Sequence, residues 1–409
     1  NNRLENNFER FKNNISKSNP SFSNISSEDE TKIRFISNQK SENLKFSYGG
    51  NIQFSNYQNN TQFEFYNTDY NTKIDFVKYG LFLKSNSTFI DDKLGLSLGV
   101  RLDQDNFTQE NNIFENLSPR LALSLIISED KKWKFNFATG RYFKIPTYTS
   151  LGFKNFDNVF LNKSTKYTRS DHIVGGFEFN WTESSRFTFE AFYKKYNNYP
   201  VSKVDGVSLA NKGADFEVLG NEEILTIGKG KSYGLEFLYQ QKLKDNFYGI
   251  LSYTFFYSKF SGLDKIYLPS VWDNRHLLSF TGGYKLKKNW ELSTKIKFTG
   301  KTPYSPVDIV SSTQSYPEII FDYSQLGNYY LNDFTKLDVR VDKRWNFKST
   351  SMNFYIDIEN LLMDEIPVPP EYGLQRDGNL NIVDPRNLIE VISDNRNSLI
   401  PSIGFVFDF

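Results

Sequence analysis

Few positions in this chain combine residue types that bind a metal ion. Asp103, Asp105 and Glu110 lie close together, and their carboxylate oxygens are ligands that suit Ca²⁺. Acidic residues in a connecting segment are more often simply solvated, so calcium is kept as the alternative interpretation. The two histidines, His172 and His276, are far apart, and cysteine is absent, which argues against a zinc or thiolate site. We therefore expect no other metal site.

Two further patterns bear on catalysis. His276 lies near Asp273, and this is the one candidate acid–base pair in the chain. Residues 228–232 read Gly-Lys-Gly-Lys-Ser, the ending of a phosphate-binding loop, but they run into a predicted strand rather than a helix. The nucleophile elbow, the dinucleotide fingerprint and the zinc-protease motif are all absent from the sequence. We expect a protein that is not an enzyme and needs no cofactor.

Aromatic rings in the long connecting segments are the candidate ligand-binding groups. Rings of this kind stack on sugar or peptide faces, although packing of one loop against another uses them in the same way and is the favoured interpretation. The candidates are Tyr148, Phe153, Tyr267, Trp272, Tyr304, Tyr323 and Tyr329.

The elements that position these rings are predicted to be strands. From about residue 31 onward, segments of roughly ten residues alternate apolar and polar side chains, as in Leu94 to Asp103. At the end of the chain Phe405, Phe407 and Phe409 share one face, opposite Gly404 and Asp408. Such alternation is typical of a soluble β-sandwich and equally of an outer-membrane barrel, so it does not decide between them.

The lengths of the connections favour the barrel. Short and long connections alternate, and this is the asymmetry between periplasmic turns and extracellular loops. This parity places the carboxyl terminus in the periplasm. The short ones are 128–132, 182–186, 241–246, 286–289 and 346–351; the long ones are 104–117, 144–171, 197–230, 258–275, 300–334 and 363–401. Four of the five tryptophans flank short turns, where an interfacial ring is stable: Trp133, Trp181, Trp290 and Trp345.

Composition agrees with a barrel. Aromatic residues make up 17% of the 409 residues, yet only 38% of the chain is hydrophobic, which fits lipid-facing rings around a wet lumen. No apolar run approaches the roughly 20 residues that a membrane-spanning helix needs. The net charge of +1 gives no basic field for nucleic acid. We expect an all-β, transmembrane antiparallel barrel with about 16 strands over residues 31–409. We expect residues 1–30 to be an irregular N-terminal segment or an extracellular or periplasmic loop.

Several short motifs, in this order, resemble those of TonB-dependent outer-membrane receptors. They are Gly99–Asp103 ("GxRxD"), Leu117–Leu123 (containing "SPR"), Tyr233–Phe237 ("YGxE"), Asp273–His276 ("DxRH"), Phe298–Tyr304 (similar to "TGxPY") and Ile358–Leu362 (similar to "NLF"). The Asn- and Lys-rich style resembles receptors of Bacteroidetes-type bacteria.

The resemblance implies a barrel of about 22 strands whose lumen holds an N-terminal plug. No plug is recognised in this chain and the strands are fewer, so we interpret it as the carboxyl-terminal part of the barrel. The implied function is import of a siderophore, glycan or peptide across the Gram-negative outer membrane. Its implied partners are membrane lipid, the plug, a TonB-type energy coupler acting through the plug, and a surface lipoprotein. A passive porin-like channel and a structural subunit of an outer-membrane complex are the alternatives.

Charged residues on the non-lipid faces of the strands are expected to line the lumen, because a charge facing mid-bilayer lipid costs about 2–4 kcal/mol. We expect them to form a charge-paired wall that docks the plug. They are Arg120, Lys336, Asp338, Arg340, Asp342 and Glu359.

Overall fold

The computed structural model describes most of the chain. The described residues are 2–11, 20–63, 68–109, 112–155, 157–212, 219–316, 319–379, 381–384, 386–391 and 398–409.

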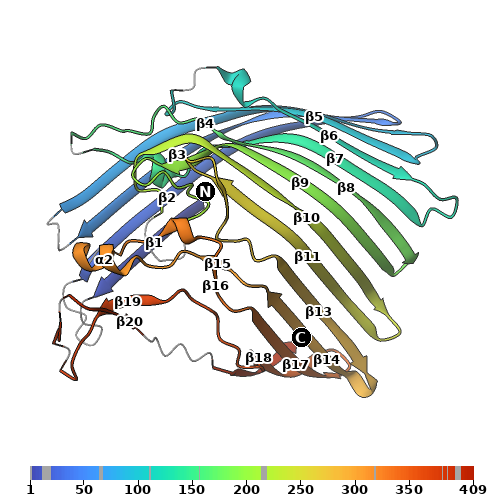
Figure 1. The fold of residues 1–409 in the computed structure, drawn as a ribbon. Coiled ribbons are helices and arrows are strands. Elements are labelled where there is room, and N and C mark those ends of the chain that lie inside the picture. The colour runs from blue at the N-terminus through green and yellow to red at the C-terminus, as the bar shows by residue number, and fades with distance from the viewer. Residues whose placement is uncertain are drawn as a thin grey trace.

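Within these residues, one antiparallel sheet of 17 strands makes up most of the protein (Figure 1). This number includes the three-residue β12 and agrees with the expected strand count. The strands are β1 (Asn2–Phe11), β2 (Pro20–Lys40), β3 (Leu44–Phe63), β4 (Thr68–Phe89), β5 (Leu94–Asp105), β6 (Ser118–Ile126), β7 (Trp133–Lys144), β8 (Thr168–Thr182), β9 (Ser185–Ser202), β10 (Ile224–Lys244), β11 (Phe247–Ser261), β12 (Tyr267–Pro269), β13 (His276–Leu286), β14 (Trp290–Thr299), β17 (Phe334–Asn346), β18 (Ser351–Glu359) and β21 (Ile400–Asp408).

The remaining elements are short. The 3₁₀ turn Lys287–Asn289 forms the short link between β13 and β14, and the others lie in the long connections. Two small hairpins pair β15 with β16 and β19 with β20. In the described part of the chain, no helix is long and apolar enough to cross a membrane. These elements are β15 (Pro303–Tyr304), β16 (Tyr329–Tyr330), β19 (Glu371–Leu374), β20 (Leu388–Val391), α1 (Tyr148–Leu151), α2 (Ile309–Ser315) and the 3₁₀ turns Ile113–Asn116, Lys287–Asn289 and Tyr323–Gln325.

Each long strand pairs with its neighbours in chain order, so the sheet is a continuous meander that curves into a trough (Figure 1). Among the described strands, β1 pairs with β2 alone and β21 with β18 alone. Short turns lie at one rim and long connections at the other, as the sequence predicts.

Turn chemistry explains the tight rim. The link between β10 and β11 is the dipeptide Asp245–Asn246, and both residues have positive φ, at 50° and 68°. Two-residue hairpins of this kind need left-handed backbone, which Asp and Asn tolerate better than other residues with a side chain.

The expectation of an irregular segment over residues 1–30 is wrong. β1 and the first half of β2 lie within these residues. They pair as antiparallel strands, with Asn2 opposite Glu30. The alternation of apolar and polar residues is missing here, because both faces of these strands are mostly polar. The backbone ladder forms without apolar alternation, since hydrogen bonding between strands does not depend on side-chain type.

Strand ends also extend further than expected into one long connection. β9 continues to Ser202 and β10 begins at Ile224, so the connection predicted over 197–230 is shorter in the structure.

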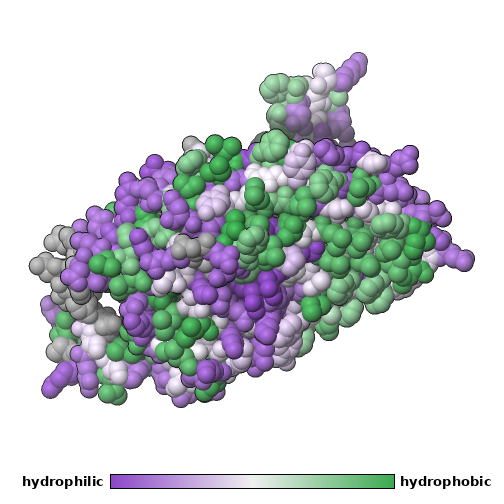
Figure 2. All heavy atoms as spheres, turned by 90° about the horizontal axis from the view of Figure 1, so that it is seen from above, coloured by the Kyte–Doolittle hydropathy of each residue, from purple (hydrophilic) through white to green (hydrophobic). Residues whose placement is uncertain are grey.

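The two faces of the sheet differ as predicted. Large apolar side chains such as Leu81, Ile173 and Phe405 are exposed on the convex outer face. Seen from above, hydrophobic residues gather over the half of this face nearer to the short turns, whereas the half nearer to the long loops is mostly hydrophilic (Figure 2). Charged and small polar residues alternate with them on the concave inner face. The apolar surface therefore points outward, as membrane contact requires.

Candidate functional site: the inner wall and the loops above it

Charged side chains on the inner face of β17 and β18 form ion pairs with one another. Arg340 forms an ion pair with Asp342 at 2.8 Å, and its guanidinium lies 3.8 Å from the centre of the Tyr355 ring. Lys336 contacts Glu359 at 2.8 Å and Asp338 at 3.6 Å. These groups are partly exposed, and wet ion pairs stabilise a fold by only about 0–1 kcal/mol each. Their stronger effect is to present an ordered polar surface to the interior.

Arg120 lies on the inner face but not in this wall. It is on β6, where its guanidinium stacks 4.4 Å from the centre of the Tyr142 ring. Tyr142 in turn lies 4.7 Å from the ring of His172, and His172 Nε2 is 2.6 Å from the hydroxyl of Ser170. The alternation of side chains along β6 predicts that Arg120 is on the inner face. The order of the strands, however, puts β6 and β17 far apart in the sheet. The interior therefore has a second polar patch, formed by Arg120, Tyr142 and His172.

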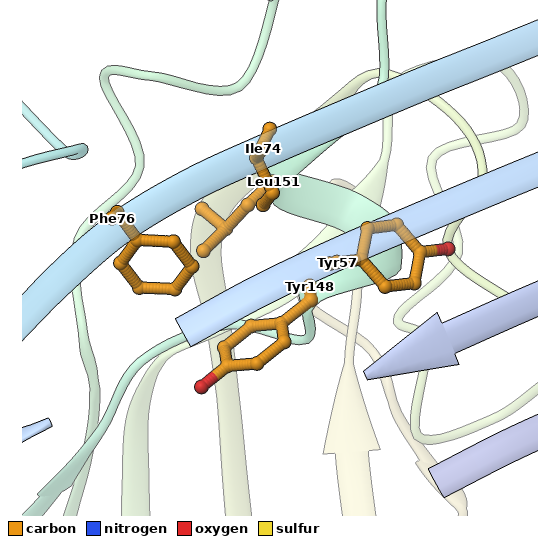
Figure 3. Packing of buried hydrophobic residues seen from close by; sticks show 5 residues of the cluster. All are labelled: Tyr57, Ile74, Phe76, Tyr148 and Leu151. Atoms are coloured by element: carbon orange, nitrogen blue, oxygen red, sulfur yellow. The ribbon is translucent and has the colours of Figure 1, made fainter. Parts of the chain in front are cut away.

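The long connection 145–167 folds over the inner face of the first strands. Its α1 residues Tyr148 and Leu151 pack against Tyr57 on β3 and against Ile74 and Phe76 on β4, and all five are buried (Figure 3). This is the apolar cluster that the structure places inside the trough. The cluster fixes the connection against the wall instead of leaving it free above the rim.

Polar contacts complete this attachment. The Tyr148 hydroxyl donates a hydrogen bond to Glu30 at 2.5 Å and accepts one from Lys78, which also pairs with Glu30 at 3.0 Å. Burial raises the pKa of the Tyr148 phenol, and the hydrogen bond to Glu30 raises this pKa further. The phenol therefore stays protonated and remains a donor at any physiological pH.

We expect Tyr148→Phe to lower the free energy of unfolding by about 1–3 kcal/mol, because the change leaves Glu30 and Lys78 without their shared partner. Chemical denaturation of the full receptor measures this loss. The control is Tyr329→Phe, since Tyr329 is 46% exposed and has no hydrogen bond to its hydroxyl among the described residues. Equal effects of the two substitutions would contradict the role given to the Tyr148 hydroxyl.

The predicted loop aromatics do not converge on one point. Phe153 stacks on Tyr70 of β4 at 6.0 Å, close to Tyr148. Tyr267 lies on the outer side of the sheet, where Lys231 is 4.7 Å from its ring centre. Trp272 lies on the inner side: its indole N–H donates to the Ser258 hydroxyl at 3.1 Å.

A third group lies in the connection between β14 and β17. Tyr304 and Tyr329 face each other across the small hairpin with ring centres 6.0 Å apart. Tyr323 contacts another loop, where the Lys212 ammonium is 5.7 Å from its ring centre. Loop packing therefore accounts for Tyr323, while the rings of Trp272, at 43% exposure, and Tyr329 remain accessible.

The geometry above is that of a barrel wall with loops folded over its interior, and comparison with known families agrees. The family model described as TonB dependent receptor-like, beta-barrel matches residues 1–361. The chain belongs to this TonB-dependent receptor family. The expected family is thereby confirmed, and the Bacteroidetes-type origin stays a prediction.

Solved structures show the same fold for this receptor chain. It is similar to the pyoverdine outer membrane receptor FpvA of Pseudomonas aeruginosa PAO1, with a TM-score of 0.60 and 13% identity over 95% of this chain and 54% of that chain. BauA, the ferric preacinetobactin receptor of Acinetobacter baumannii, has a TM-score of 0.57 and 12% identity over 95% and 55%. The outer membrane transporter YddB of Escherichia coli has a TM-score of 0.54 and 12% identity over 94% and 54%.

The receptor chain spans about half the length of these solved structures. A comparison with curated proteins found no match. The family and the similar structures are receptors and transporters, which confirms the expectation that this chain is not an enzyme.

The acidic residues considered for calcium have other partners in the receptor. Asp103 holds the guanidinium of Arg101 through two contacts of 2.5 and 2.6 Å. Asp105 accepts hydrogen bonds from the backbone N–H groups of Phe107 and Thr108, each at 2.7 Å, and thus stabilises the start of the loop. Glu110 lies outside the described residues. Among those that are described, no three acidic, histidine or cysteine residues form a group that could hold a metal ion.

One polar cluster of the receptor loops was missed by sequence reasoning. Lys212, only 11% exposed, pairs with Asp205 at 2.7 Å and Glu222 at 3.1 Å, and Glu222 also accepts a hydrogen bond from Ser202. Sequence signals for it are absent, because single charged residues spread along one long connection look like ordinary solvated loop residues. Only the folded loop brings them together.

Proposed function

We propose that this chain forms most of the barrel of an outer-membrane import receptor. The observation that carries the proposal is the division of the sheet into an apolar outer face and a charged inner face, with long loops folded over the interior. The apolar face suits a lipid bilayer, and the charged face suits a wet lumen. Two of the similar proteins are a pyoverdine receptor and a ferric preacinetobactin receptor, which supports iron complexes as the ligand class.

We place the receptor with its short turns in the periplasm and its long loops outside the cell. With this orientation β21 descends from a long loop, and the carboxyl terminus is periplasmic. The edges of β1 and β21, each with one neighbour among the described strands, support further strands that complete a larger barrel. Unpaired edges expose backbone hydrogen-bonding groups, which have no partner in lipid.

Within this orientation, the two inner polar surfaces have different proposed roles. The wall built around Arg340 and Lys336 docks a plug domain, which a TonB-type energy coupler pulls to release ligand inward. The rings that remain accessible, Trp272 and Tyr329, hold the ligand before release, together with Tyr304, which faces Tyr329 across the small hairpin. Tyr267 is excluded from this set because it faces the outer side of the sheet. A surface lipoprotein that caps the loops stays a prediction.

Uptake by cells that express the complete receptor tests the function. We expect accumulation of labelled ferric pyoverdine or ferric preacinetobactin to depend on an intact energy coupler. The double substitution Trp272→Ala and Tyr304→Ala should reduce uptake at least about tenfold, since stacked aromatic groups contribute about 0.5–1.5 kcal/mol each beyond their buried area. The matched control is Phe347→Ala, an exposed ring in the opposite, short-turn rim.

Each contrary outcome identifies a different function. Unchanged uptake by the double variant would mean that these rings do not bind the ligand. Ion conductance across a planar bilayer without any coupler would favour a passive channel. Stable co-purification with other surface proteins, together with no uptake of either ferric complex, would favour a structural subunit.

A further inference from the structure

Three long connections of the receptor are joined to one another at the long-loop rim. We call their described residues the roof: 145–155, 157–167, 203–212, 219–223 and 262–275. Two of the connections are joined through their backbones. The N–H of Val271 donates to the carbonyl of Ala210 at 3.1 Å. The N–H of Leu263 donates to the carbonyl of Gly206 at 2.9 Å. Backbone hydrogen bonds of this kind are typical of one cooperative unit.

Asn162 joins the first connection of the roof to the second. Its side chain is fully buried, and its amide N–H groups donate to the carbonyls of Ser150 at 2.6 Å and Glu222 at 2.8 Å. Its amide oxygen accepts a hydrogen bond from the N–H of Ile224 at 2.9 Å, so both donors and the acceptor are used. Gly220, with φ of 86°, permits the close approach, because a β-carbon there would lie 2.5 Å from the Ser150 hydroxyl.

Asn211 joins the second connection to the third. Its side chain is also buried, and its amide N–H groups donate to the carbonyls of Leu268 at 3.2 Å and Pro269 at 2.7 Å. Separating the connections would leave these buried donors and carbonyls without partners, which is costly. A buried polar network whose groups are satisfied holds its parts rigidly. Asn162 and Asn211 therefore connect all three parts of the roof.

The connection 300–333 between β14 and β17 is built differently. Its described residues fold largely on themselves, with hydrogen bonds at the start of α2 and between α2 and the residues that follow it. Gly327 touches the roof at Pro269, where a β-carbon on the glycine would lie 2.9 Å from Cγ of the proline. Val310 and Tyr329 are 69% and 46% exposed. Exposed side chains and few buried contacts mark a segment of low local stability.

We propose that the roof stays closed as one rigid body, held together by Asn162 and Asn211, and that the connection 300–333 opens to admit the ligand. The apolar cluster around Leu151 fixes the roof to the inner face of the barrel, so the roof is not free to swing outward. Opening therefore occurs at the adjacent segment, which has the weaker attachment. The opening step rests on the import function proposed above, whereas the rigidity of the roof does not.

Hydrogen exchange of the full receptor in detergent tests whether the roof is one unit. Asn162→Asp keeps the size of the side chain but places a carboxylate against two carbonyl groups. We expect exchange at least about thirtyfold faster in 145–167, and by a similar factor in 203–212 and 262–275, because a cooperative unit opens as a whole. The control is Asn158→Asp, an exposed position in the first connection, which should leave exchange unchanged.

Asn211→Ala is a milder change at the other joint and gives the same comparison if the first variant does not assemble. It should accelerate exchange by about fivefold to tenfold in all three connections, since two buried hydrogen bonds are lost. Migration on gels without heating shows which variants form a folded barrel. Faster exchange confined to the connections that touch the substituted residue would overturn the proposal.

Engineered disulfides test which segment opens, and the natural chain has no cysteine to interfere. Gly327→Cys with Pro269→Cys ties the connection 300–333 to the roof, because the two positions lie within reach of a disulfide. We expect oxidation to reduce uptake of a labelled ferric complex at least about tenfold, and reduction to restore it, since only closed receptor remains. The matched control is Ala210→Cys with Val271→Cys, a disulfide inside the roof that should leave uptake unchanged.

The contrary outcomes are distinct. Loss of uptake with the disulfide inside the roof would show that the roof itself must open. Normal uptake with 300–333 tied down would show that the ligand enters elsewhere. Gly327→Cys alone, measured in the same way, shows any effect of the substitution itself. If the unmodified receptor takes up no ferric complex, the import function is wrong, and hydrogen exchange still decides whether the roof is one unit.

Discussion

Replacing Leu151 with aspartate is expected to detach the connection 145–167 from the inner face of the barrel. Leu151 is fully buried against Tyr57, Ile74 and Phe76. The cation close to this cluster, Lys78, is already paired with Glu30. A carboxylate placed there costs several kcal/mol unless it is protonated, and opening of the loop removes this cost. Hydrogen exchange followed by mass spectrometry should show at least about a hundredfold faster exchange in 145–167, since local opening sets the exchange rate.

The control for this change lies in the same connection. Val159→Asp introduces the same charge at a side chain that is 54% exposed, so exchange in 145–167 should stay near that of the unmodified receptor. Similar exchange for both variants would show that the apolar cluster does not hold the connection. If the barrel with Leu151→Asp fails to assemble, the cluster is needed for folding. The yield of protein in the outer membrane and its migration on gels distinguish this outcome from local opening.

The second large effect concerns two neighbouring residues on opposite faces of β10. Leu235→Arg puts a cation on the outer face, two residues nearer to the short turns than Tyr233, where lipid contact is expected. It should lower the free energy of unfolding in vesicles by about 2–4 kcal/mol, because charge in the bilayer interior is costly. Glu236→Arg, on the inner face, should have little or no such cost. The measurement is equilibrium denaturation of the full receptor in lipid vesicles.

The inner substitution carries its own physical expectation. Glu236 lies directly opposite Glu190 across β10 and β9, and like charges in this position repel. An arginine at 236 replaces that repulsion with attraction, so Glu236→Arg serves as a control that can even be stabilising. If Leu235→Arg costs no more than Glu236→Arg, then the outer face does not contact lipid, and the membrane location is wrong.

Local patterns in the sequence determined most of the architecture. Strand period, face and turn length depend on residues that are close together in the chain, such as the Asp245–Asn246 turn. These features predicted the rim of tight turns that the structure shows. They failed over residues 1–30, because strands with two polar faces carry no alternation although their backbones still pair.

Only the tertiary structure decided which distant groups meet. Trp272 and Tyr267 look alike as loop aromatics, yet a strand pairing puts Tyr267 on the outer side and leaves Trp272 on the inner side. The contact of Tyr148 with Glu30 and Lys78, and the alignment of Glu236 with Glu190, depend on strand register. Register depends on the pairing of all the residues along two neighbouring strands, so no single residue or spacing in the sequence predicts it.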